Sequence, residues 1–143
     1  MIRRLALAFW ELPQNALGAA NFALSGALGR VERVTRDRGR VMIELRRSGA
    51  VSLGSFVFWT RADNPWVPVG AENRDHEFGH SIQSRMLGPL YLPLVGVPSS
   101  ARALYAVGYR VVRGKRWAHY YDGWPEKAAD RLGGVDRSLR PPP

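Results

Sequence analysis

Apolar residues recur at helical spacing near the start of the chain, every three or four positions: Leu17, Ala20, Leu24 and Leu28. This is the spacing of an apolar stripe along one face of a helix. Pro13 suits the first turn of such a helix. We therefore predict a helix over residues 14–29 that packs its stripe on the core of the domain. A helix that lies on a membrane surface is the alternative.

The next segment changes from helical spacing to alternation. Val41, Ile43 and Leu45 alternate with more polar neighbours, which is the period of a half-buried strand. Turn-forming residues separate the apolar runs: Asp37-Arg38-Gly39 and Ser48-Gly49. Residues 50–58 form a further strand, with Gly54 as a bulge or point of close approach. We expect a small antiparallel meander of two hairpins.

The second half of the chain predicts helices. Residues 74–87 lack proline and have a helical pattern, whereas the charge-free run 86–101 is broken by three prolines and should be a loop. Ser99 or Ser100 can cap a helix that continues to about residue 113. A short helix over 125–132 ends at a pair of glycines. Together with the strands, these helices predict an α+β fold.

The chain has 143 residues, a length that suits one compact domain. We expect residues 1–30 to form a helical segment packed on a domain that spans 31–137. Residues 138–143, which end in three prolines, should be a disordered tail.

The formal net charge is +9 and is concentrated in two segments. Residues 30–47 carry seven arginines and three acidic residues, and residues 102–116 carry five basic residues and no acidic one. Such segments could contact nucleic acid, anionic lipid or an acidic partner. Solvated faces are the simpler interpretation, because only two of the 21 basic residues are lysine. No nucleic-acid-binding motif is present, so we do not expect a nucleic-acid partner.

The chain starts Met1-Ile2-Arg3-Arg4 and then becomes apolar, as a signal peptide does. Glu11 and Pro13 interrupt the apolar run, and the 14–29 segment is too short and too polar to predict a membrane span. We expect a cytoplasmic or membrane-associated protein rather than one secreted through a cleavable signal peptide. A weak association with a membrane surface stays open.

The most informative motif is His76-Glu77-Phe78-Gly79-His80, which has the pattern HExxH. On a helix, residues four apart lie on the same face. Two imidazole nitrogens can then reach one Zn²⁺ at about 2.0–2.1 Å. Glu77 lies beside the metal, where it can take a proton from a water that zinc activates and later pass it to the leaving amine. The motif uses two of the three histidines in the chain.

A third ligand is available further along the chain. Glu126 and Asp130 are four residues apart, so both can face the metal from a second helix. Glu126 would complete a His₂Glu site with one position left for water. Asp130 would then hold an imidazole in the correct tautomer. There are no cysteines, so a cysteine zinc site and a thiol nucleophile are excluded.

HExxH followed by Glu126-x-x-Ala129-Asp130 resembles the gluzincin branch of zinc metallopeptidases. The resemblance implies Glu126 as third ligand and Asp130 as partner of a ligand histidine. Residues 75–85, with the stretches Leu87–Leu92 and Gly96–Ser99, also resemble a group of bacterial zincin-like domains. The similarity covers residues 50–135 and implies a small zincin-like fold.

The zincin resemblance also implies an edge strand beside the cleft that pairs with an extended substrate, and residues 50–58 are the candidate. His119, Tyr120 and Tyr121 are candidates for a donor that stabilises the oxyanion. The spacing selects none of the three.

These observations favour zinc-dependent hydrolysis of peptide bonds in a peptide or protein substrate. Two other hypotheses remain at this stage. One is a zincin fold that binds without cutting, and the other is a basic domain that binds nucleic acid or a membrane surface and contains HExxH by chance. The sequence does not indicate the oligomeric state.

Overall fold

The computed structural model describes residues 6–7, 9–47, 49–68, 70 and 72–138. The expected tail lies outside the described residues except for Ser138. The elements are, in order, α2 (Leu12–Ala27), β1 (Val31–Asp37), β2 (Arg40–Leu45), β3 (Val51–Leu53), β4 (Phe56–Thr60), α3 (Asn73–Leu87), η1 (Gly88–Leu90), η2 (Leu92–Gly96), α4 (Val97–Arg113), η3 (Ala118–Tyr121) and α5 (Glu126–Gly133). The fold is α+β, as predicted.

The four strands form one mixed sheet in the order β1-β2-β4-β3. The first expected hairpin is present, because β1 pairs antiparallel with β2. The expected single strand over residues 50–58 is wrong, because the chain turns at Gly54 and Ser55 and divides it into β3 and β4, which pair antiparallel with each other. The predicted meander is wrong, since β2 pairs with β4 in parallel. The bulky apolar strand β4 takes the interior position beside β2, and the three-residue strand β3 is left at the edge.

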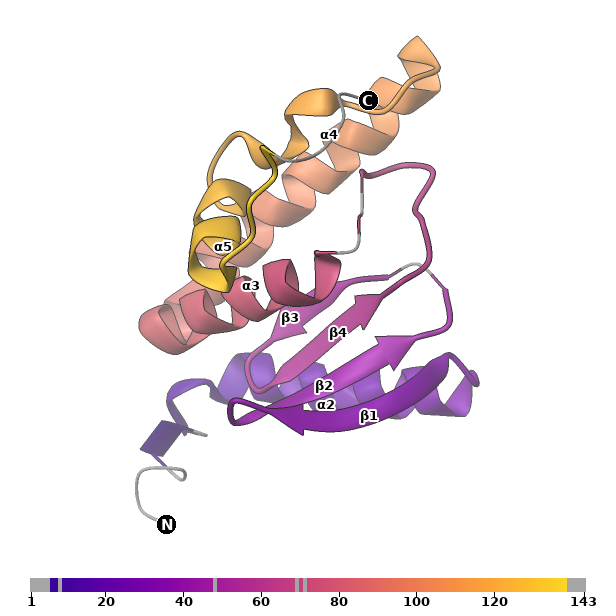
Figure 1. Cartoon of the computed structure of the whole chain (residues 1–143). Helices are drawn as coiled ribbons and strands as arrows, with labels where there is room; N and C mark the ends of the chain where they lie inside the picture. The colour runs from indigo at the N-terminus through magenta and orange to yellow at the C-terminus, as the bar shows by residue number, and fades with distance from the viewer. Residues whose placement is uncertain (1–5, 8, 48, 69, 71, 139–143) are drawn as a thin grey trace.

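Helices cover both faces of this sheet, as Figure 1 shows for α3 in front and α2 behind. Met42, Val57 and Trp59 pack with Phe78 of α3. On the other face, Ile43, Leu45 and Phe58 form a cluster against which Phe22 of α2 packs. Consecutive residues of β2 are therefore buried, and the prediction that this strand is half-buried is wrong.

Helix α2 packs on the sheet with the opposite face to the one predicted. Its buried residues are Gln14, Gly18 and Ser25, whereas Leu17, Leu24 and Leu28 of the apolar stripe are 49–57% exposed. Buried polar contacts fix this orientation. The Gln14 side chain donates to the carbonyl of Gly88, and a side chain at Gly18 would collide with Phe56.

The charge-free run after α3 is helical rather than a loop. Each of its prolines lies in the first turn of a helix: Pro89 in η1, Pro93 in η2 and Pro98 in α4. A missing N–H costs nothing at that position. The other predicted helices agree within two residues with α3 and α5. In the part of the chain that the structure describes, no helix has the length and apolar character needed to cross a membrane.

Candidate metal centre

The site lies where α5 crosses α3 with their backbones in contact (Figure 1). A Cβ at Gly79 would overlap the carbonyl of Ala129, and one at Gly133 would overlap the carbonyl of Asp75. Ala129 is fully buried at the crossing. Two glycines, one on each helix, thus allow a close approach that brings α5 side chains over the HExxH face of α3.

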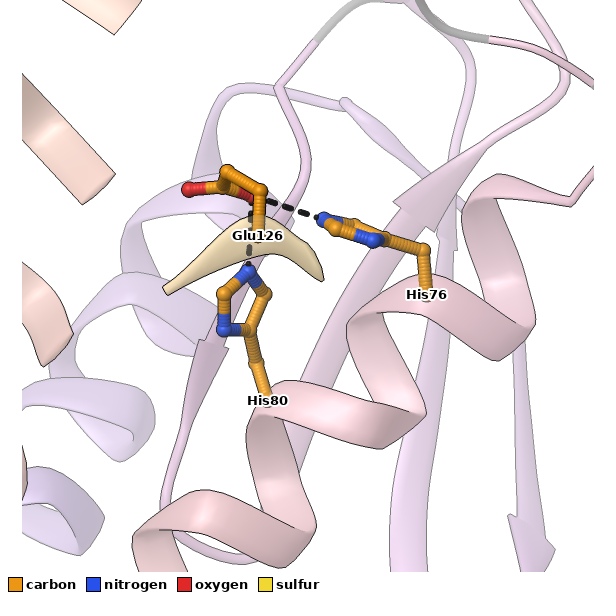
Figure 2. A group of neighbouring side chains, drawn as sticks. All are labelled: His76, His80 and Glu126. Carbon is orange, nitrogen blue, oxygen red and sulfur yellow. Dashed lines mark hydrogen bonds and ion pairs between the residues drawn. The ribbon is translucent and has the colours of Figure 1, made fainter. Parts of the chain in front are cut away.

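His76, His80 and Glu126 meet at this crossing, as Figure 2 shows. The Oε2 atom of Glu126 lies 3.0 Å from Nε2 of His76 and 3.1 Å from Nε2 of His80. All three residues are buried. The structure therefore brings together the three ligands predicted from the sequence, which lie up to 50 positions apart.

The donor set fits a metal ion. Each imidazole directs Nε2 at the carboxylate, so three atoms that can each donate a lone pair converge and could share one cation. A tetrahedral ion with ligands at about 2.0–2.1 Å separates them by about 3.3 Å, close to the distances found. The other carboxylate oxygen, Glu126 Oε1, is buried and lacks a hydrogen-bond partner among the described residues.

The outer nitrogen of His76 is held by Asp130, with 2.7 Å between Nδ1 and Oδ1. Arg137 in turn donates to both oxygens of Asp130 at 2.5 and 2.7 Å. Burial raises the pKa of Asp130, but hydrogen bonds from His76 and Arg137 outweigh it and lower this pKa below its usual value. An ionised Asp130 accepts a hydrogen bond from Nδ1–H of His76, which keeps the proton on Nδ1 and leaves Nε2 free to bind a metal ion.

The charges of the cluster shift the pKa values of His76 and Glu126 in opposite directions. Burial lowers the pKa of His76, but hydrogen bonds with Asp130 and Glu126 raise it to about 9. Burial raises the pKa of Glu126, and its contacts with the two histidines lower it well below the usual range. Both pKa shifts have the same cause, because the buried carboxylates and imidazoles are close enough for a positive charge to be favourable beside the negative ones.

His80 is oriented from its own helix. The distance between its Nδ1 and Oε1 of Gln83 is 2.7 Å, and the Gln83 amide donates to the carbonyl of Pro125 at 3.2 Å. Because Pro125 directly precedes Glu126, Gln83 links the second histidine to the start of the helix that supplies the third ligand.

Glu77 is buried beside the ligands and is held by Ser52 of β3. The Ser52 hydroxyl lies 3.1 Å from Oε2 of Glu77 and also contacts the Glu77 carbonyl oxygen. Burial raises the pKa of the Glu77 carboxyl, while the Ser52 hydrogen bond lowers it. A carboxyl with a raised pKa is suited to accepting and returning a proton.

Two cavities open onto Glu77. A cleft of about 550 Å³ is lined by Glu77, His80 and Glu126 and by apolar residues of β3 and α4. A smaller cavity of about 180 Å³ reaches His76 and Glu77 from the side of the loop before α3. Tyr120 lines both. Glu77 is therefore accessible from both cavities, one of which also reaches His80 and Glu126 and the other His76.

The three candidate oxyanion donors occupy different places. Tyr120 is buried and lines the cleft. Tyr121 packs the edge of its ring against His76, with the centroids 5.1 Å apart, and stacks under Arg137. His119 is 75% exposed and pairs with Asp122. The structure thus brings the two tyrosines, but not His119, to the site.

Four residues of the site escaped the sequence analysis: Ser52, Gln83, Tyr91 and Arg137. Gln83 lies three positions after His80 on the same helix, so helical spacing could have indicated it. Ser52 and Tyr91 carry no signal in the sequence, because their contacts depend on the packing of β3 against α3 and η1. Tyr91 donates its hydroxyl to the Ser52 carbonyl at 2.9 Å.

Comparison with protein-family models, with curated proteins and with solved structures finds no match to this chain. The case for its chemistry therefore rests on the residues of this buried His₂Glu cluster, which could hold a metal ion.

Proposed function

We propose that the chain is a zinc-dependent peptidase of gluzincin type. The observation that carries the proposal is the convergence of Glu126 with His76 and His80, with Glu77 beside them and open to the cleft. A His₂Glu donor set matches hydrolytic zinc centres, in which three protein ligands leave one position open. When bound, a zinc ion lowers the pKa of water and polarises a carbonyl group.

Glu77 serves as the general base and then as the acid. Its carboxylate takes a proton from the attacking water and returns it to the amine that leaves. The Ser52 hydroxyl holds the Glu77 carboxylate while it changes protonation. Tyr120, whose hydroxyl is hydrogen-bonded with Ser99, is the donor best placed to stabilise the oxyanion, because it lines both cavities.

The substrate lies along β3, the edge strand of the sheet. In a two-residue hairpin the pair that flanks the turn, Leu53 with Phe56, is hydrogen-bonded. Ser52 therefore directs its backbone groups to the open side, where its carbonyl already accepts a hydrogen bond from Tyr91 and its N–H is the group left to pair with a substrate. A peptide can pair there as an added strand. The apolar walls of the cleft favour uncharged side chains in the substrate.

The first test is elemental analysis of the purified protein and two variants. Wild type and Glu77→Gln should each contain one zinc per chain, because Glu77 is not a ligand, whereas Glu126→Ala should lose zinc. Wild type should cleave unstructured peptides, and Glu77→Gln should not. Failure of wild type to bind supplied zinc would overturn the proposal. Zinc binding without cleavage would instead identify a zincin-like binding protein.

A further inference from the structure

The outward surface of α2 is entirely apolar. Every exposed position of the helix holds leucine, alanine, glycine or proline. Leu12, Leu17 and Leu24 are 55%, 49% and 57% exposed. The polar residues of the helix are buried or half-buried against the rest of the domain. This distribution is the reverse of that of a surface helix in water, which turns its polar face outward.

Buried polar groups prevent α2 from turning its apolar face inward. Glu11, which precedes the helix, is completely buried. It accepts a hydrogen bond from Ser84 at 2.7 Å and lies 3.9 Å from the buried guanidinium of Arg40. Rotation of α2 would leave these groups without partners inside the protein, which is costly. The exposed leucines are therefore a fixed property of the fold.

The apolar surface continues beyond the N-terminal end of α2. Phe9 is 74% exposed, and Trp10 is 47% exposed with its indole N–H donating to the Arg85 carbonyl at 3.0 Å. The Trp10 ring lies over Gly88. We call the side chains of Phe9 and Trp10 and the outward leucines of α2 the α2 face.

The C-terminal end of the α2 face is bordered by positive charge. Arg30 follows the helix, and its carbonyl accepts a hydrogen bond from the Arg46 backbone, which places Arg46 and Arg47 beside it. All three arginines are exposed. Glu32 pairs with Arg46 at 2.9 Å, so this end retains a net positive charge. The sequence contains no charged residue between Leu12 and Gly29.

We propose that the α2 face docks on the surface of an anionic lipid bilayer. A helical face of leucine and alanine, with aromatic residues at one end and arginines at the other, can bury its apolar side chains among acyl chains while the arginines contact anionic headgroups. The 16 residues of α2 extend about 24 Å, so the helix lies along the surface. A second copy of the chain fits less well, because protein interfaces carry about one hydrogen bond per 100–200 Å², and this face exposes only apolar side chains along α2.

The test is flotation of the full chain with vesicles of phosphatidylcholine, with and without phosphatidylglycerol. Wild type should bind the anionic vesicles, and salt should weaken the binding. The double variant Leu17→Asn/Leu24→Asn should reduce binding by about tenfold or more, because it removes two leucines that the bound protein buries in the lipid. Two single variants form a matched pair. Leu24→Asn should weaken binding. Leu132→Asn changes an exposed leucine of α5 on the other side of the sheet and should leave binding unchanged.

Zinc content and circular dichroism of each variant report whether the fold is retained, and neither depends on lipid.

The double variant Arg30→Gln/Arg47→Gln should lose the preference for anionic vesicles. Failure of wild type to bind either vesicle overturns the proposal, and a dimeric mass with no vesicle binding would assign the face to a second copy. Equal losses in Leu24→Asn and Leu132→Asn would also overturn it.

Discussion

Backbone contact between α3 and α5 is the feature on which the metal centre depends most directly, and Gly79→Ala tests it. A Cβ at Gly79 would overlap the Ala129 carbonyl oxygen and lie 2.7 Å from the carbonyl carbon. Carbon atoms in contact prefer about 3.5–4.0 Å, so α5 must move by about 1 Å. Metal sites tolerate only about 0.2 Å in their ligand distances. The added methyl group should therefore separate Glu126 from the two histidines.

Two opposing effects set the stability of this variant. Alanine is a better helix former than glycine by about 0.8–1.0 kcal/mol, whereas overpacking costs about 1–3 kcal/mol and sometimes more. We expect net destabilisation. Gly108→Ala is the matched control, since Gly108 lies within α4 and a Cβ there would meet no atom within 4 Å. This control should be neutral or slightly stabilising and should keep its zinc.

The assay is zinc affinity by competition with a chelator, together with urea unfolding in the metal-free state. Removal of a residue that only orients a ligand costs roughly 10–100-fold in metal affinity. Gly79→Ala should lose at least as much zinc affinity, because it displaces the ligand Glu126 itself. Wild-type zinc affinity in Gly79→Ala would refute the reasoning. So would an equal loss in Gly108→Ala, because the cause would then be the substitution of glycine in general.

Three further changes probe other parts of the site. Asp130→Asn should lower zinc affinity by about 10–100-fold, measured by chelator competition, and unchanged affinity would remove Asp130 from its orienting role. Ser52→Ala should keep zinc but reduce kcat by about tenfold, since the carboxylate of Glu77 loses a hydrogen bond, whereas Ser52→Thr should retain activity. Glu11→Ala should destabilise the fold by about 3–5 kcal/mol in urea unfolding, because the buried Arg40 guanidinium loses its carboxylate partner and, among the described residues, keeps only hydrogen bonds to Ser81. A loss below 1 kcal/mol, roughly, would contradict that account.

The sequence predicted that the candidate ligands lie together because their spacing has a direct geometric meaning. His76 and His80 had to share a helical face, and Glu126 with Asp130 had to share another. Nothing local could show that the two helices cross in contact. That outcome depends on Gly79 and Gly133, whose roles emerge only when α5 is placed on α3.

The predictions that failed concern packing rather than local structure. Leu17 and Leu24 mark the apolar stripe correctly, but the stripe faces outward because Glu11 and Gln14 find buried partners on α3 and η1. Likewise, the apolar runs of the strands were located correctly, but residues 50–58 form two strands instead of one, and the strand order differs from the predicted meander. Strand order is set by which strand can be buried on both faces, and the β4 run from Phe56 to Thr60 meets that requirement better than β3.

Helix α3 shows why a functional site is hard to identify from hydrophobic pattern alone. Among its core-facing apolar residues only Phe78 is buried, yet nine of its 15 residues are buried, and most of those are polar. Burial of polar side chains is favourable only when each has a partner. Here the partners come from every neighbouring element: β3 and β4 through Ser52 and Thr60, β2 through Arg40, and α5 through the third ligand. A helix with so few apolar residues would ordinarily be predicted to lie at the surface. Its burial here means that its side chains are positioned by specific hydrogen bonds, which is the condition that a metal centre with a fixed geometry requires.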